Sequence, residues 1–141
     1  MQRGLGGEGM SQLCWLTPPD VFKKLDDEFH FNFDPCPYPR PADYDGCGVE
    51  WGTSTYVNPP FRKVDAFNGK GPTAFMRKAI LENQRGKTVV VVAPVQSYVG
   101  MMVDAGAELR NLGRVRWLNG ETKEPCKDPS TIVAFILRGS R

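Results

Sequence analysis

The chain of 141 residues lacks several features that mark large functional classes of proteins. It has one histidine, His30, and its four cysteines show no Cys-x-x-Cys spacing, so we expect no metal site. It has no apolar run long enough to span a bilayer and no signal peptide, which favours a cytoplasmic protein with reduced thiols and no membrane partner. The net charge of +2 is small, so composition alone neither requires nor excludes a nucleic-acid partner.

The distribution of glycine and apolar residues predicts one domain preceded by a tail. Four of the first ten residues are glycine, so residues 1–11 are expected to form a flexible tail and residues 12–141 a single domain. The β-branched run at 88–93 predicts a strand buried on both faces, as in a parallel sheet covered by helices. Together with the alternation of strands and helices, this run predicts an α/β fold with an open sheet.

The other elements are expected from apolar spacing and from proline and glycine at their ends. We predict an amphipathic helix over about 18–28, with Thr17 as its N-cap and Pro18 as its first residue. Further helices are expected from about Pro72 to Arg85 and, more weakly, over 98–108. Further strands are expected at 31–34, 55–57, 114–118 and 130–137, and residues 37–53 are expected to form a long irregular loop.

The most informative motif is the turn Asn58-Pro59-Pro60-Phe61, directly after the predicted strand 55–57. Two prolines end the strand, because proline lacks the backbone N–H and fixes φ. The turn then offers an amide side chain, a backbone carbonyl and an aromatic face, which together suit a flat heterocycle with an exocyclic amine. A rigid structural turn is the alternative interpretation, since such sequences are common in loops. Asp34, at the end of another predicted strand, is expected at the same edge of the sheet, where ligands of open α/β sheets bind.

The order of the motifs resembles that of the phage-type DNA N6-adenine methyltransferases. The ordered set is Trp15-x-Thr17-Pro18, Phe33-Asp34-Pro35-Cys36, Asp45-Gly46 with Trp51, and Asn58-Pro59-Pro60-Phe61, and the similarity covers about residues 14–138. The resemblance implies a compact Rossmann-like methyltransferase sheet flanked by helices, and S-adenosylmethionine as the methyl donor. It also implies an adenine-specific, site-specific DNA-methyltransferase, encoded by a phage and acting in the cytoplasm of a bacterial host.

The resemblance further assigns roles to individual residues. Asn58 and Pro59 would accept hydrogen bonds from the adenine amine within the catalytic turn that Pro60 and Phe61 complete, and Phe61, with Tyr56 as a second candidate, would stack on the ring. The residues expected at the donor are Trp15, Thr17, Pro18, Asp34, Pro35 and Cys36, with either Asp45 or Glu50 on the ribose hydroxyls. The residues expected at DNA phosphates are Arg62, Lys63, Lys70, Lys123 and Lys127.

Several interpretations stay open at this point. The chain is too short for a separate target-recognition domain, so either specificity for double-stranded DNA is slight or a partner subunit, such as a second copy in a homodimer, supplies part of the DNA surface. RNA adenine or a glutamine amide would present a similar planar amine. The family has a glycine-rich loop after the acidic residue, whereas this chain has Pro37-Tyr38-Pro39-Arg40-Pro41. This departure motivates a different class of function, a catalytically degenerate methyltransferase fold that binds nucleic acid.

Overall fold

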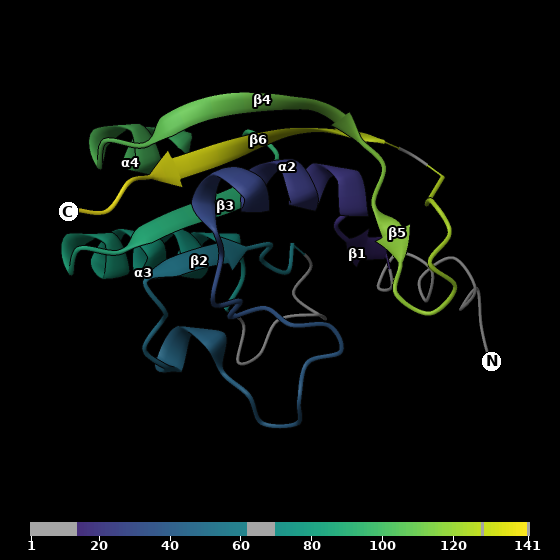
Figure 1. Ribbon diagram of the computed structural model, residues 1–141, viewed down its shortest axis with the longest axis horizontal. Helices are drawn as coiled ribbons and strands as arrows, with labels where there is room; N and C mark the ends of the chain where they lie inside the picture. Colours follow the sequence, from purple (N-terminus) through teal and green to yellow (C-terminus); the bar gives the residue numbers. More distant parts are fainter. Residues whose placement is uncertain (1–13, 62–69, 128, 141) are drawn as a thin grey trace.

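The computed structural model describes residues 14–61, 70–127 and 129–140 (Figure 1). The predicted tail, Arg62 and Lys63 therefore lie outside the described residues. The described part is an α/β structure with one four-stranded sheet, and it includes no helix that is long and apolar enough to cross a membrane.

The sheet has the strand order β2-β3-β6-β4, formed by Ser54–Val57 (β2), Thr88–Ala93 (β3), Ser130–Leu137 (β6) and Glu108–Val115 (β4). β2 pairs with β3 in parallel, whereas β6 is antiparallel to both β3 and β4. The predicted strand at 88–93 is confirmed with its bounds. The sheet around it is mixed, however, and not the all-parallel sheet that its apolar run suggested.

Alternating side chains of the strands build a core on each face of the sheet. Val89 and Val91 of β3 point to one face, and Val90 and Val92 point to the other, all with no exposed surface. This is the period of two that a strand requires, and burial on both faces explains why every position is apolar.

Helices cover both faces, as the layered arrangement in Figure 1 shows. Helix α2 (Pro19–Phe29) buries Leu25 against the face that carries Val90. Helices α3 (Pro72–Gln84) and α4 (Val99–Asp104) pack on the opposite face, where Met76 and Met102 have no exposed surface. The prediction that Pro72 begins α3 is confirmed, with Gly71 as its N-cap.

The smaller elements lie outside the four-stranded sheet. Strand β1 (Cys14–Leu16) pairs antiparallel with β5 (Leu118–Asn119), and a short 3₁₀ helix, η1 (Gly46–Gly48), interrupts the long loop before β2.

Several sequence predictions about local structure are wrong, among them the strand at 31–34, of which only Phe33 forms an isolated bridge, with Thr55. Thr17 does not cap α2, because Pro18 is the N-cap and the Thr17 hydroxyl bonds instead to the hydroxyl of Tyr56. The strand predicted at 114–118 begins earlier, at Glu108, and ends at Val115. The expectation of reduced thiols holds for Cys36 and Cys47, which are free, but Cys126 is disulfide-bonded.

A buried carboxylate connects α3 to the start of β3. The Glu82 side chain on α3 has no exposed surface, and its carboxylate lies 2.6 Å from Nζ of Lys87, 2.8 Å from Nζ of Lys78 and 3.0 Å from the guanidinium of Arg85. Lys87 also donates a hydrogen bond to the backbone carbonyl of Trp51 at 2.5 Å. Glu82 therefore joins the helix to the segment that leads into the central strand.

Candidate active site

The site is built where two neighbouring parallel segments end. Phe33 forms a parallel bridge with Thr55 of β2, and the backbone N–H of Tyr56 donates to the Phe33 carbonyl at 3.0 Å. This register brings Asp34, just after Phe33, and Asn58, just after Val57, to the same edge of the sheet. The juxtaposition expected from the sequence is therefore present.

The turn after β2 is held tightly from the core side. Val57 has no exposed surface, Pro59 is buried, and Phe61 packs against the core on the α3 face. The side-chain oxygen of Asn58 is buried, although the residue as a whole is half-buried. The prolines and Phe61 thus fix the backbone that carries the Asn58 amide.

Two adjacent hollows open at this edge, and Cys36 and Asn58 line both of them. The Asp45 hollow is also lined by Pro35, Pro37, Arg40, Asp45, Gly46, Pro60, Lys70 and Phe75. The Asp34 hollow is also lined by Leu16, Thr17, Pro19, Phe22, Asp34, Tyr38 and Tyr56. The Asp34 hollow is the larger, at about 230 Å³ against about 40 Å³, so it is the better match for a ligand of nucleoside size.

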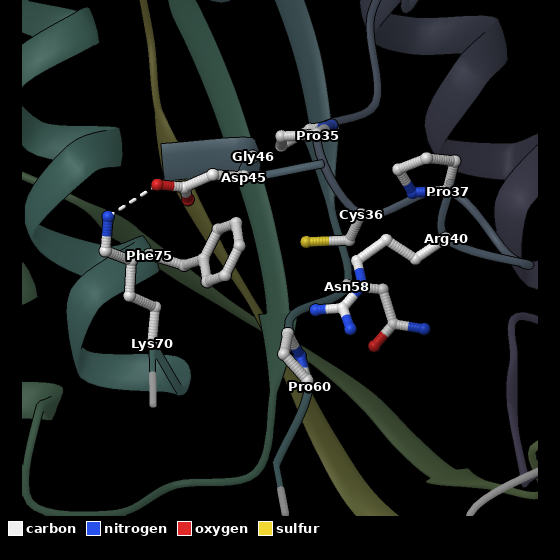
Figure 2. Close-up of a pocket in the computed structure, with 10 residues that line it drawn as sticks. All are labelled: Pro35, Cys36, Pro37, Arg40, Asp45, Gly46, Asn58, Pro60, Lys70 and Phe75. Atoms are coloured by element: carbon white, nitrogen blue, oxygen red, sulfur yellow. Dashed lines mark hydrogen bonds and ion pairs between the residues drawn. The ribbon is translucent and has the colours of Figure 1, made fainter. Parts of the chain in front are cut away.

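Figure 2 shows the Asp45 hollow. Lys70 and Asp45 lie on one side of it, and Arg40 and Asn58 lie on the opposite side. The Asp45 carboxylate contacts Nζ of Lys70 at 2.6 Å and accepts a hydrogen bond from the backbone N–H of Cys47 at 3.0 Å. Burial acts to raise the pKa of Asp45, but the Lys70 ammonium and these hydrogen bonds outweigh it and lower the pKa. The carboxylate is therefore held in its charged form.

Asp34 has a different electrostatic environment. Its carboxylate accepts a hydrogen bond from the backbone N–H of Cys36 at 2.8 Å, and Asp34 as a residue is exposed. Neighbouring protein atoms nevertheless desolvate the carboxylate, and this raises its pKa to about 6 against the opposing effect of the Cys36 hydrogen bond. Asp34 consequently changes charge close to neutral pH.

The structure separates the predicted donor residues into two groups. Thr17 and Asp34 line the Asp34 hollow, Pro35 and Asp45 line the Asp45 hollow, and Cys36 lines both. Of the two candidate ribose ligands, Asp45 is thus the one beside the turn. Two further candidates, Glu50 and Pro18, are not among the described lining residues, and a third cannot be placed. Glu50 pairs with Lys87 at 3.2 Å, Pro18 is the N-cap of α2, and the Trp15 side chain lies outside the described residues.

The predicted DNA contacts are also divided. Lys70 forms an ion pair with Asp45 within the site, whereas Lys123 and Lys127 are exposed residues in the segment between β5 and β6. Arg116 steadies that segment by donating hydrogen bonds to the backbone carbonyls of Cys126 and Lys127. The Lys123 ammonium donates a hydrogen bond to the backbone carbonyl of Gly120, and Lys70 is itself partly exposed, so exposure does not single out any of the three described lysines.

Sequence reasoning missed several residues that line the two hollows. Tyr38 and Arg40 come from the proline-containing segment after Asp34, and Phe75 comes from the first turn of α3. The position of residues 37–41 directly after Asp34 is the signal that would have found Tyr38 and Arg40. Phe61, which was expected to stack on a ligand ring, is not among the described residues that line either hollow.

Comparison of the chain with protein-family models, with curated proteins and with solved structures yields no match.

Proposed function

We propose that this chain transfers a methyl group from S-adenosylmethionine to the N6 amine of adenine in DNA, and that its sheet is a compact version of the Rossmann-like methyltransferase sheet. One observation carries the proposal. Asp34 and Asn58, from two parallel segments, line one hollow at the carboxyl edge of the sheet. Ligands of open α/β sheets bind at this edge.

The role proposed for Asn58 follows from the chemistry of an aromatic amine. The nitrogen lone pair of adenine is delocalised into the ring, so the amine is a weak nucleophile. The buried Asn58 oxygen and the Pro59 carbonyl would accept the two amine hydrogens and favour the geometry in which the lone pair attacks. Positioning and electrostatic stabilisation would supply most of the rate, and a strongly basic catalyst is not required.

The groups in the Asp34 hollow fit a nucleoside donor. Asp34 provides a carboxylate that accepts hydroxyl or ammonium hydrogens, and the Cys36 N–H uses one of about four acceptor positions of that carboxylate. Thr17 provides a hydroxyl, and Leu16 and Phe22 provide apolar walls. When bound, S-adenosylmethionine supplies a methyl group on a positively charged sulfur. A carboxylate in the hollow favours a positively charged ligand.

The titration of Asp34 gives a testable pH dependence of donor binding. Because the pKa of Asp34 is about 6, the carboxylate is mostly neutral below that pH and charged above it. We expect the affinity for S-adenosylmethionine to rise from about pH 5 to about pH 7.5, with a midpoint near the Asp34 pKa. Titration calorimetry across this range would measure the effect, and Asp34→Asn should remove the dependence. An unchanged dependence in Asp34→Asn would show that another group is responsible.

Adenine in duplex DNA would have to leave the base stack to reach Asn58. This extrusion costs on the order of a few kcal/mol, which contacts in the site must offset. Lys123 and Lys127 are the described candidates for phosphate contacts, and such contacts weaken as salt concentration rises. A partner subunit would extend the DNA surface beyond this small chain.

The proline-containing segment favours one alternative, a degenerate fold that binds nucleic acid without catalysis. Pro37 and Arg40 line the Asp45 hollow, and Tyr38 lines the Asp34 hollow. If these walls exclude the donor, calorimetry with S-adenosylmethionine should detect no binding either with or without DNA.

The acceptor is tested by comparing labelled methyl transfer to DNA, RNA and protein substrates. We expect transfer to DNA, because the resemblance on which the acceptor rests is to DNA methyltransferases. Preferential transfer to RNA adenine or to a glutamine amide would replace DNA as the substrate but keep the role of Asn58.

A further inference from the structure

Three aromatic rings among the described residues line the Asp34 hollow, and two of them belong to the core. Phe22 and Tyr56 meet edge to face with ring centroids 4.9 Å apart, and Phe31 contacts both, with centroids at 5.7 Å from Phe22 and 5.3 Å from Tyr56. The third ring, Tyr38, comes from the segment after Asp34. Among the described residues, the two core clusters do not include Tyr38. Tyr38 therefore lines the hollow from the segment after Asp34 and not from either core cluster.

Gly120 makes room for the Tyr38 ring. A Cβ added at Gly120 would lie 2.1 Å from Cε2 of Tyr38 and 2.6 Å from its hydroxyl oxygen, so the ring occupies the space that a side chain would need. Gly120 is not among the described glycines with positive φ, so its backbone conformation does not itself require glycine. A larger residue at this position would therefore have to displace the Tyr38 ring.

The segment that carries Gly120 is itself ordered by local hydrogen bonds. The side-chain oxygen of Asn119 accepts from the backbone N–H groups of Glu121 at 2.8 Å and Thr122 at 3.1 Å. Asn119 is buried, and its backbone N–H donates a hydrogen bond to the carbonyl of Glu124 at 2.9 Å. The Tyr38 ring is thus placed against a fixed backbone and presented to the hollow.

We propose that Tyr38 is the residue that stacks on an adenine ring in the Asp34 hollow. This inference rests on the proposed function and identifies the aromatic platform that Phe61, packed against the core, does not provide. The hollow brings Tyr38 together with Asp34 and Asn58, whose carboxylate and amide oxygens can accept hydrogen bonds from a nucleoside. Both the donor and the target nucleotide carry an adenine ring, so the chemistry is the same for either source.

The test uses Tyr38→Ala, which removes the ring, and Tyr38→Phe, which keeps it. One arm measures binding of S-adenosylhomocysteine by calorimetry, and the other measures the preference for an oligo(dA) strand over an oligo(dT) strand by fluorescence anisotropy. Removal of a stacking ring should weaken binding roughly 5- to 100-fold. We expect Tyr38→Ala to lose affinity in one of the two arms, and that arm identifies whether the adenine belongs to the donor or to the nucleic acid. Tyr38→Phe, which keeps the ring, should bind with an affinity close to that of the wild-type protein. Val95→Ala, an exposed site outside both hollows, is the control.

A second variant, at Gly120, changes the position of the same ring. Gly120→Ala should push Tyr38 into the hollow and weaken binding in the same arm as Tyr38→Ala, with a circular dichroism melt to show that the variant is folded. Wild-type affinity for both probes in Tyr38→Ala would overturn the role of Tyr38 while leaving the proposed function intact. Failure of the wild-type protein to bind either probe would overturn the proposed function and this inference together.

Discussion

Replacement of Asn58 by alanine is expected to abolish methyl transfer while the protein stays folded and still binds the donor. Removing a single group that stabilises a transition state typically lowers the rate by about 10²–10³-fold. The loss of rate in Asn58→Ala should lie at the upper end of this range. Asn58 lines both hollows, and no other described side chain of the turn carries an amide that could replace it. Single-turnover transfer of a labelled methyl group would measure the loss.

The fold should survive the Asn58→Ala change because other residues of the turn hold the backbone. Val57 and Pro59 are buried, and Phe61 packs against the core. Gln84→Ala is a matched control, since it removes an exposed amide from the end of α3. Wild-type turnover in Asn58→Ala would contradict the assigned mechanism. Loss of turnover together with loss of S-adenosylhomocysteine binding would instead show that Asn58 holds the donor.

Replacement of Glu82 by glutamine is expected to destabilise the fold by about 3–5 kcal/mol, the usual cost of removing one partner from a buried ion pair. Glu82 has no exposed surface, and its loss would leave Lys78 and Lys87, both largely buried, without their shared counter-charge. Urea unfolding at neutral pH would measure the change. Glu108→Gln is the control, because its ion pairs with Arg110 and Arg138 are partly exposed and such pairs contribute at most about 1 kcal/mol.

The same carboxylate gives the fold an acid-sensitive component. Burial acts to raise the pKa of Glu82, but hydrogen bonds and charges from Lys78 and Lys87 lower it from 4.5 to about 2. A carboxylate whose pKa is lowered by folding stabilises the protein above its unfolded pKa and loses that contribution as pH falls through its folded pKa. The difference in unfolding free energy between wild type and Glu82→Gln should therefore be largest above pH 4.5 and shrink as the pH falls toward about 2. A difference that does not change with pH would contradict this assignment.

Local patterns in the sequence predicted the elements whose residues are uniformly buried or clearly bounded. The β-branched run of β3, the strand β6 and the proline that begins α3 are of this kind. The turn at Asn58 and its place beside Asp34 were also predicted, because parallel segments place their carboxyl ends at the same edge.

Features that depend on contacts between distant residues could not be predicted in the same way. Strand β4 begins at Glu108 because β6 supplies its hydrogen-bond partners, although charged residues at 108 and 110 conceal a strand pattern. The sequence makes Glu50 a candidate ligand for the ribose, but in the structure its carboxylate pairs with Lys87. The aromatic wall that Tyr38 provides depends on Gly120, which is far away in the sequence.

The central claim, adenine methylation in DNA, is tested most directly by nucleoside analysis of unmodified DNA after incubation with the protein and labelled S-adenosylmethionine. The account predicts label in N6-methyladenine, and none when Asn58→Ala replaces the wild-type protein. Recovery of unlabelled DNA from the wild-type reaction, or of label only in methylated cytosine, would contradict it.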